Sequence, residues 1–404
     1  MNIAQPTLAP AAPVDAIPRD YNFAAAILEH NLDAGRGEKI AYIDPRGSWT
    51  YRDLAGRVDS FGRALRALDI RREERILICL LDSIDWPTAF LGAIKAGVVP
   101  VPVNTLLTED DYRFMLEDSR ARLLVVSEEL YPKFAKAIGA CANLAHVVVS
   151  GANGHGHQRF EELLAGGGPA MTAAPTVRDD ICFWLYTSGS TGKPKAAVHT
   201  HADLALTDEL YAKPFLGIGE TDVCYSVAKL FFAYGLGNAL TFPMAAGATT
   251  ILLPDRPTPE LVAAILKKHQ VTVLYAVPTF YAAFLASPQA PERGETRLRR
   301  CVSAGEALPA DVGRRWSERY GADILDGIGS TEMLHIYVSN RAGEVKYGTT
   351  GKPVPGYDVR LVDDDGRVVE KRGEMGELQV RGPTSAMLYW NNREQSRATF
   401  LGEW

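Results

Sequence analysis

LYTSGSTGKPKAAVHTH, residues 185–201, joins an apolar run to a segment of hydroxyls, glycines and lysines. The apolar run, residues 181–186, is typical of a buried strand. The nine residues 187–195 contain two glycines and two lysines among hydroxyl side chains. Glycine lets the backbone turn its N–H groups toward an anion, hydroxyls donate hydrogen bonds, and lysine adds positive charge. The stretch therefore predicts a phosphate-binding loop that follows a buried strand.

The P-loop of nucleoside triphosphatases does not fit this loop. That motif needs Gly, four further residues, and then Gly-Lys followed by Ser or Thr. Here Gly189 and Gly192 are only three positions apart, and Pro194 follows Lys193. The loop alone leaves open a plainer interpretation, a flexible Gly/Ser surface loop between two strands.

The same loop resembles the phosphate loop of the adenylate-forming superfamily, which includes acyl- and aryl-coenzyme A ligases, adenylation domains and luciferases. The resemblance extends over about residues 20 to 404. One difference is Ala196, where the family usually has glycine, and this change removes no ligand. By this resemblance Lys195 is catalytic, and the loop residues that contact ATP are Thr187, Ser188, Gly189, Ser190, Thr191, Gly192 and Lys195.

Further motifs match this superfamily in the same order along the chain. VSAGEAL, residues 302–308, is the segment that lies against the adenine and the acyl group in the family, although a strand followed by such a turn is common. In DGIGSTE, residues 326–332, the resemblance implies that Thr331 bonds the α-phosphate and that Glu332 holds Mg²⁺. A carboxylate is a hard oxygen ligand that suits this ion, but a glutamate at an ordinary helix start is the alternative. The other ATP contacts implied here are Gly305, Glu306, Ala307, Asp326, Gly327, Ile328, Gly329 and Thr331.

Composition describes a globular protein without a nucleic-acid partner. The 404 residues are 47% hydrophobic and 23% charged, and the formal net charge is −6. Five widely spaced cysteines without a metal-binding pattern predict reduced, mostly buried thiols in a cytoplasmic protein. The first 18 residues lack a basic start and an apolar core, so they are not expected to be a signal peptide. Apolar runs stay well short of the roughly 18 residues that a membrane span needs.

Apolar strand patterns alternate with helical patterns along most of the chain. This order predicts an α/β fold with two parallel sheets, each covered by helices on both faces. From about residue 348 the pattern changes to short strands with turns, which predicts a small antiparallel, barrel-like part. We expect residues 1–20 to be a disordered leader and residues 21–404 to be the large N-terminal domain of an adenylate-forming enzyme. Relatives continue into a small C-terminal domain that supplies a lysine for adenylation, so we also expect this chain to be a truncated form with impaired activity.

The acid pocket of this superfamily is walled by three segments that can be located here. They contain KLFFAYG at residues 229–235, Ala304, and the residues that follow Glu332. Aromatic and small side chains predict a short, flat slot that admits one benzene ring and excludes a long acyl chain, although such aromatic clusters are often plain core. The expected lining residues are Phe232, Ala233, Tyr234, Ala304, Gly329, His335 and Ile336. His335 is either the polar group that meets a ring substituent or a structural histidine.

KLFFAYGLGNALTFP and DGIGSTEMLHIYVSN look most like benzoate- and 4-hydroxybenzoate-coenzyme A ligases. The resemblance implies an acid–thiol ligase that uses ATP, Mg²⁺ and coenzyme A to convert an aromatic acid to the aryl-adenylate and then to the thioester. Two alternatives stay open: an enzyme that loads an aryl acid onto a carrier protein, and a non-catalytic nucleotide- or acid-binding module. The partners expected are small molecules, with no nucleic acid and no membrane, and a homodimer is left open.

Overall fold

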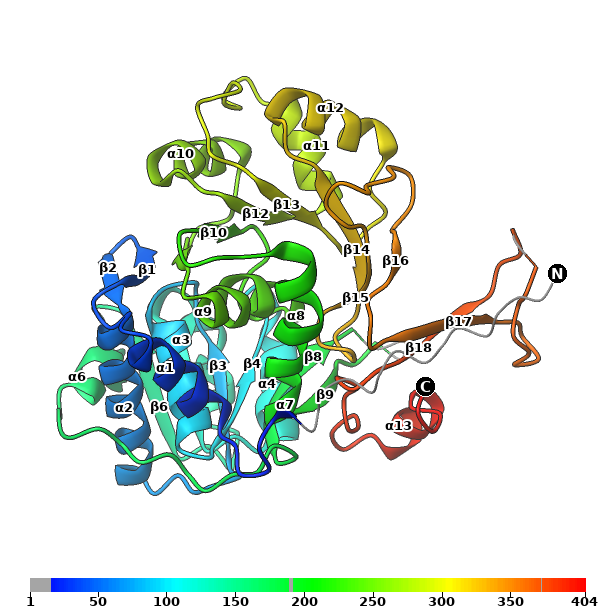
Figure 1. The fold of residues 1–404 in the computed structure, drawn as a ribbon. Helices are drawn as coiled ribbons and strands as arrows, with labels where there is room; N and C mark the ends of the chain where they lie inside the picture. Colours follow the sequence, from blue (N-terminus) through cyan, green and yellow to red (C-terminus); the bar gives the residue numbers. More distant parts are fainter. Residues whose placement is uncertain (1–15, 189–191, 372) are drawn as a thin grey trace.

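The computed structural model describes residues 16–188, 192–371 and 373–404, so Gly189, Ser190 and Thr191 of the phosphate loop and most of the expected leader lie outside the described part. Two α/β layers make up most of the molecule, and a narrow antiparallel ribbon projects from them (Figure 1). The helices are α1 (Phe23–Asp33), α2 (Tyr51–Ala67), α3 (Asp85–Lys95), α4 (Glu109–Ser119), α5 (Ala135–Ile138), α6 (Phe160–Leu164), α7 (His201–Thr207), α8 (Ala233–Leu236), α9 (Phe242–Ala246), α10 (Pro259–His269), α11 (Pro278–Ala286), α12 (Ala310–Tyr320), α13 (Arg393–Thr399), the 3₁₀ helix η2 (Glu128–Lys133) and the π-helical segments η3 (Asp208–Leu216) and η4 (Gly237–Thr241).

The first sheet is parallel and has five strands. Its strands are almost entirely apolar, as in LLVVS of β5, because helices cover both faces. Helices α2 and α3 pack on one face, and α4 packs on the other. The strand order is β4 (Val99–Pro102), β3 (Arg75–Cys79), β5 (Leu123–Ser127), β6 (His146–Ser150) and β7 (Gln158–Arg159).

The second sheet has nine strands, parallel in its centre and antiparallel at its edges. Helices α10, α11 and α12 cover one face, and η3 covers the other. The strand order is β16 (Lys352–Pro353), β15 (Ile336–Ser339), β14 (Ile324–Gly329), β13 (Arg300–Ser303), β12 (Val273–Ala276), β10 (Val223–Ser226), β11 (Thr249–Ile251), β1 (Ile40–Asp44) and β2 (Gly47–Thr50).

Strand β1 belongs to this second sheet, although the sequence places it before every strand of the first. It pairs with β11, with Tyr42 opposite Thr250. The whole first sheet is therefore an insertion between β2 and β10. The order of elements along the sequence does not reveal this, because β1 and β11 are about 200 residues apart and each is apolar enough to fit either sheet.

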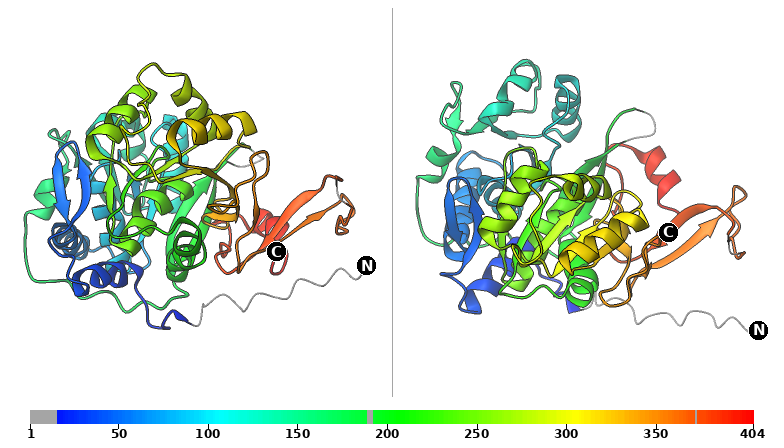
Figure 2. Two further views of the ribbon diagram at one scale, coloured as in Figure 1. Left: turned by 45° about the horizontal axis from the view of Figure 1, so that its top comes forward. Right: turned by 90° about the horizontal axis from the view of Figure 1, so that it is seen from above.

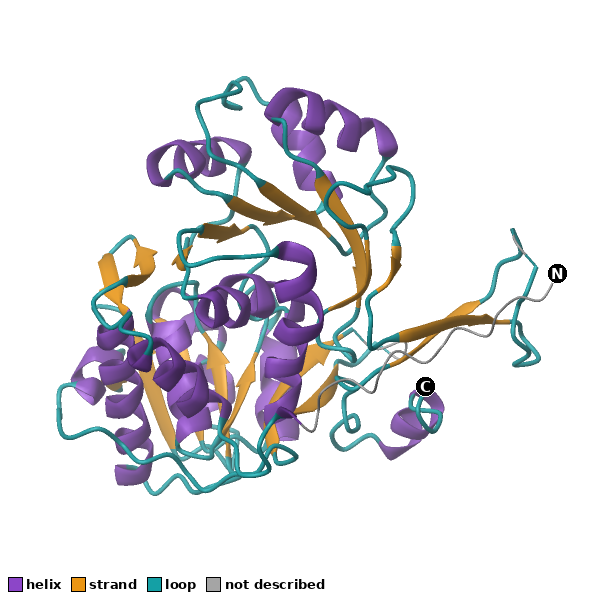
Figure 3. Ribbon diagram, viewed as in Figure 1, coloured by secondary structure: helices purple, strands orange, loops and turns teal. Residues whose placement is uncertain are grey.

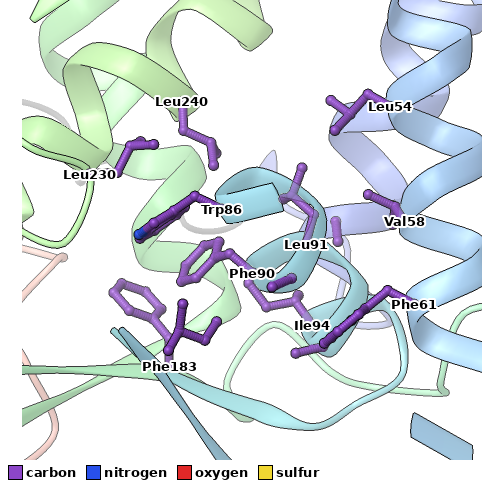
Figure 4. Packing of buried hydrophobic residues seen from close by; sticks show 14 of the residues in the cluster. Leu54, Val58, Phe61, Trp86, Phe90, Leu91, Ile94, Phe183, Leu230 and Leu240 are labelled. Atoms are coloured by element: carbon purple, nitrogen blue, oxygen red, sulfur yellow. The ribbon is translucent and has the colours of Figure 1, made fainter. Parts of the chain in front are cut away.

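The two α/β layers share one hydrophobic core. Trp86 and Phe90 of α3 stack with ring centroids 5.1 Å apart, and Phe90 meets Phe183 at 5.5 Å. Leu230 and Leu240, which follow a strand of the second sheet, approach the same aromatic cluster (Figure 4). This shared core fixes the two layers against each other.

An antiparallel pair, β8 (Ile181–Thr187) and β9 (Lys195–Thr200), flanks the phosphate loop and lies apart from both large sheets in the strand order. Residues 387–390 run beside β9 and extend this pair. Val198 N donates to Leu388 O at 3.0 Å, and Trp390 N donates to Ala196 O at 2.9 Å. The loop is thus anchored on both of its flanks by regular strands.

The last part of the chain contains the predicted short antiparallel strands. β17 (Asp358–Val362) and β18 (Glu377–Arg381) form a two-stranded ribbon (Figures 2 and 3). Among the described residues this ribbon does not close into a barrel. Of the small barrel-like part expected here, the structure shows one antiparallel pair of strands.

Local features of the structure include one helix cap and the buried thiols that the sequence predicted. Thr50 caps α2 through a capping box with Asp53, because the hydroxyl accepts from Asp53 N and the carboxylate accepts from Thr50 N. All five cysteines are buried and free of disulfides. In the described ranges, none of the helices is long and apolar enough to cross a membrane.

Candidate active site

The candidate site lies at the carboxyl ends of the parallel strands of the second sheet. The chain passes from β10 outward to β11 and then returns to β12 on the other side of β10. At such a reversal of strand order the connecting loops diverge and leave a crevice, which is the usual ligand position in open α/β sheets. Residues that directly follow β10, β12 and β13 line a cavity here, together with the end of β14.

This cavity has a volume of about 450 Å³ and a mostly apolar lining. Every residue that the sequence predicted for the acid pocket contributes to it. The lining residues are Val227, Ala228, Phe232, Ala233, Tyr234, Val277, Ala304, Gly305, Gly329, Ser330, Thr331, Leu334, His335 and Ile336. Thr331 and Gly305, which the sequence predicted to contact the phosphate and the nucleotide, also line this cavity. The predicted nucleotide contacts therefore lie next to the predicted ring slot.

Small residues make room in this cavity where their neighbours leave none for a larger side chain. A Cβ atom added at Gly329 would lie 2.7 Å from the carbonyl oxygen of His335, closer than side-chain carbons approach such atoms. Ala304 directly follows β13 and is only 5% exposed. Both positions therefore keep the slot open by the absence of side-chain volume.

The hydroxyl of Tyr234 holds one wall in place. It donates to the carbonyl oxygens of Val302 at 3.1 Å and Ala276 at 3.3 Å, at the ends of β13 and β12. Burial raises the pKa of Tyr234 well above its ordinary value, so the group stays a neutral donor. Tyr234 thus presents its ring to the cavity while its polar end is occupied by the backbone.

His335 is buried among aromatic rings and is neutral at physiological pH. Burial lowers its pKa to about 3. Its Nε2 meets Asn238 Oδ1 at 3.2 Å, which requires the hydrogen to be on that nitrogen, while Nδ1 has no hydrogen-bond partner within the described chain. In this tautomer Nδ1 could accept a hydrogen bond, and the two roles expected for His335 both stay open.

Lys195 and Glu332 are brought together by a residue that the sequence analysis did not identify. Tyr389 donates its hydroxyl hydrogen to Glu332 Oε1 at 2.6 Å, and Lys195 Nζ donates to the Tyr389 oxygen at 3.2 Å. The ammonium group of Lys195 also lies 4.4 Å from the centroid of the Tyr389 ring. Burial, followed by the bond to Glu332, raises the pKa of Tyr389 above its usual range. Tyr389 therefore orients a cation and a carboxylate relative to each other.

A second residue that the analysis missed is His199 of β9. Its Nε2 lies 2.8 Å from the carbonyl oxygen of Thr331, and its Nδ1 lies 2.9 Å from Asp203 Oδ2. Asp203 in turn accepts from the backbone N–H of Thr200. This fully buried link ties the Thr331–Glu332 segment to the strand that carries Lys195. Only its position four residues after Lys195 could have pointed to it.

The residues expected to contact the adenine lie around the ends of β13 and β14. Ser303 and Asp326 are register partners in these strands. Burial raises the pKa of Asp326 to about 6, while the Ser303 hydroxyl and the backbone N–H groups of Leu308 and Gly327 oppose that shift. Gly305 needs a positive φ of 91°. The neighbouring Glu306, Ala307 and Ile328 are exposed, and none of them lines the apolar cavity.

The described residues fit a magnesium–nucleotide complex better than a metal held by protein alone. No group of three or more His, Cys, Asp or Glu side chains capable of holding a metal occurs in the part of the chain described. Mg²⁺ usually binds one or two carboxylates together with substrate phosphates. The carboxylate of Glu332 can supply one such oxygen ligand, and the ammonium of Lys195, linked to it through Tyr389, can pair with phosphate oxygens.

The sequence of this chain is similar to those of known proteins. Residues 28–390 match the model of a family described as AMP-binding enzyme. A benzoate–CoA ligase of Thauera aromatica is 59% identical over 97% of this chain and 74% of its own length. A 4-hydroxybenzoate–CoA/benzoate–CoA ligase of Rhodopseudomonas palustris is 47% identical over 96% of this chain and 71% of its own length.

Solved structures of other proteins also match the fold of this chain. A benzoate CoA ligase from Burkholderia xenovorans LB400 matches with a TM-score of 0.90 and 53% identity, covering 95% of this chain and 76% of that one. The anthranilate CoA ligase AuaEII matches with a TM-score of 0.93 and 40% identity, covering 97% and 75%. The α/β fold expected for the adenylate-forming superfamily is confirmed. These matches do not bear out the expectation that this chain is a truncated form with impaired activity. That expectation stays a prediction.

Proposed function

Because the chain belongs to the AMP-binding enzyme family, we propose that its apolar cavity holds the ring of a benzoate- or 4-hydroxybenzoate-type acid. The protein is an AMP-forming acid–thiol ligase that uses ATP, Mg²⁺ and coenzyme A to convert an aromatic acid to its CoA thioester. The observation that carries the proposal is the lining of the cavity: an apolar slot with Ala233, Ala304 and Gly329 at its walls opens directly toward Thr331. An aromatic ring fits within this cavity, and its carboxylate would then point toward Thr331.

The residues on the phosphate side have proposed roles that follow from their charge. Lys195 and the Thr331 hydroxyl would bind the α-phosphate, and Glu332 would hold Mg²⁺, which supplies positive charge to the triphosphate when bound. With the ring fixed in the slot, the acid carboxylate lies in line to attack the α-phosphorus and release pyrophosphate. Positioning and charge neutralisation are the main tasks of the protein in this step.

His335 has a proposed role in the choice of acid. Its unpaired, neutral Nδ1 can accept a hydrogen bond from a ring hydroxyl, whereas an unsubstituted ring would leave it unpaired. We therefore expect the acid to be selected partly by whether a substituent reaches this nitrogen.

Three further points are also proposals: the domain division, the location in the cell and the oligomeric state. The domain division is proposed as expected from the sequence, with a leader before residue 21 and one large domain up to residue 404. A cytoplasmic location is supported by the five buried, unpaired thiols. A homodimer also stays a proposal.

Enlarging a wall residue tests the acid site. Ala304→Leu adds three carbons to the slot, and overpacking of about 1–3 kcal/mol corresponds to a roughly 5- to 150-fold loss of benzoate affinity. Binding of ATP should change little. Calorimetric titration of wild type and Ala304→Leu with benzoate and with ATP measures both effects. Ala283→Leu, on the exposed side of α11, is the matched control. Unchanged benzoate affinity in Ala304→Leu would place the acid elsewhere.

A further inference from the structure

One stretch of chain, residues 227–236, forms much of the wall of the aromatic-acid cavity, and we refer to it as the wall segment. It begins after β10 and ends with α8. Val227, Ala228, Phe232, Ala233 and Tyr234 all line the cavity. Two residues of the wall segment that do not line the cavity, Lys229 and Leu230, make further contacts with the rest of the molecule.

Lys229 fastens the wall segment to the neighbouring strand connection. Its Nζ donates to the carbonyl oxygens of Leu253 and of Asp255, the latter at 2.8 Å, just after β11. The side chain is only 17% exposed. Burial lowers the pKa of Lys229, whereas the charge of Asp82 acts in the opposite direction. The long side chain of Lys229 therefore serves here to form these hydrogen bonds, and most of it is shielded from solvent.

Asp82 reaches the same segment from the other α/β layer. It follows β3 of the first sheet, and its side chain is 6% exposed. Oδ2 lies 3.9 Å from Lys229 Nζ, and Oδ1 accepts from the backbone N–H of Leu230 at 3.3 Å. Figure 4 shows Leu230 and Trp86 side by side, so packing accompanies this polar contact. One buried carboxylate therefore holds two consecutive residues of the wall segment across the boundary between the layers.

The backbone transmits the position of Lys229 to the cavity. Its carbonyl oxygen accepts from Phe232 N at 3.0 Å, at the point where the chain turns into α8. A Cβ atom at Gly235 would lie only 1.9 Å from this oxygen. With so little space, a shift of Lys229 must move the turn, and Ala233 and Tyr234 move with it. A packed interior transmits such a shift because it contains little free volume.

We propose that Asp82 and Lys229 are positioning residues for the aromatic acid: together they fix the wall segment, and with it the width of the ring slot. Neither residue touches the ring. The inference rests on the proposed function of the cavity as the acid site. It adds to that function a determinant of acid affinity that lies outside the lining and belongs partly to the other layer of the fold.

Steady-state kinetics of Asp82→Asn and Lys229→Gln test this assignment. Each variant keeps an approximate shape but removes one charge of the pair. Because sub-ångström misplacement of a bound group is costly, we expect the KM for benzoate to rise about 10- to 100-fold, while the KM for ATP stays within about 2-fold. In the double variant the two effects should not add fully, since both act on the position of the same wall segment.

Asp59→Asn is the matched control. Asp59 pairs with Lys95 at 2.6 Å in another largely buried Asp–Lys contact, and neither residue lines the acid cavity. This variant should lose stability without a selective change in the KM for benzoate. Thermal unfolding of all variants identifies any that fold poorly. If Asp82→Asn does not fold, Lys229→Gln carries the test alone, because its side chain lies nearer the surface.

Two results would overturn the inference. One is an unchanged KM for benzoate in both single variants while Ala304→Leu raises it. The other is a parallel rise in the KM values for benzoate and ATP, which would indicate a general structural role. If Ala304→Leu also leaves the KM for benzoate unchanged, it is the proposed acid site that fails, so the two hypotheses are separated.

Discussion

Tyr389 lies between a cation and a carboxylate that both belong to the phosphate side of the site. Its hydroxyl bonds Glu332 while accepting from Lys195, and its ring lies beneath the same ammonium group. Tyr389→Phe keeps the ring but removes both hydrogen bonds. Hydrogen bonds to charged groups contribute about 1.5–3 kcal/mol, so the adenylation rate should fall roughly 10- to 150-fold with benzoate affinity unchanged. Pyrophosphate exchange measures the rate, and an unchanged rate would show that Lys195 and Glu332 need no orientation from Tyr389.

Glu332→Gln addresses the metal. The amide keeps the shape of the side chain but lacks the negative charge that a hard dication prefers. We expect the variant to fold and to bind benzoate normally, with about tenfold or greater weakening of Mg²⁺-dependent ATP binding. Titration of ATP with and without Mg²⁺ in both proteins is the measurement. If Mg²⁺ affects the variant as much as wild type, Glu332 is not its ligand.

At the scale of single residues, the residues expected to form the acid pocket come together around one cavity, whereas the residues that support them were not identified from the sequence. Phe232, Ala304 and Ile336 all line one cavity, as expected from their places after successive strands. Tyr389 and His199 were missed because each acts on a partner more than 50 residues away along the chain. The Tyr389 contacts also require residues 387–390 to pair with β9, and no local pattern encodes that pairing. The loop residues Gly189, Ser190 and Thr191 stay a prediction.

Among the elements, the contact between α1 and α7 depends on a histidine that must be neutral. The backbone N–H of Phe23 donates to His201 Nδ1 at 3.2 Å, and the charged ring could not accept this bond. Burial lowers the pKa of His201 to about 4. Between this value and the ordinary value of 6.5, the unfolded chain takes up a proton that the folded chain refuses, so stability falls as the pH decreases through that range.

Replacing His201 should therefore reduce acid sensitivity. His201→Gln retains an acceptor but has no proton to gain. Between pH 7 and pH 5 we expect wild type to lose up to about 2 kcal/mol more unfolding free energy than the variant. Urea denaturation at both pH values measures the difference. His155→Gln, at an exposed position, should behave like wild type. Equal losses in wild type and His201→Gln would show that His201 is already protonated in the folded protein.

Element boundaries illustrate which sequence signals are reliable. Thr50 is an example of a local signal: a hydroxyl residue directly before a helical apolar pattern favours a helix start, and it is the N-cap of α2. The apolar stretch after residue 230 gave no such signal, and it forms α8, η4 and α9 in succession with bonding that changes from α to π and back. Packing between the two sheets sets that path, and its apolar sequence carries no periodic pattern from which the path could be predicted.

In the molecule as a whole, every thiol is buried in a core. Burial raises the pKa of both Cys79 and Cys301 to about 12, so little thiolate forms at neutral pH. We expect the native protein to react with a thiol reagent at least about tenfold more slowly than a free cysteine, and all five cysteines to react after unfolding. Absorbance with a chromogenic disulfide reagent measures both rates. Rapid labelling of folded protein would contradict the burial of these side chains.

The fold class followed from the alternation of strands and helices, but the architecture did not. Sequence order suggests two successive α/β units, whereas β1 and β2 complete the second sheet and enclose the first as an insertion. The shared hydrophobic core around Trp86 likewise brings together residues from both α/β layers (Figure 4). Both features depend on contacts between distant segments, which periodicity along the chain cannot specify.

The pairing of residues 387–390 with β9 has a consequence for synthesis on the ribosome. β9 emerges roughly 190 residues before its neighbour, which at 5–20 residues per second leaves it waiting for about 10 to 40 s. Throughout that interval one edge of the β8–β9 hairpin offers unpaired N–H and C=O groups, a template for pairing with another chain. We therefore expect the nascent protein to expose this edge until residues 387–390 have been made, for a time that lengthens as synthesis slows.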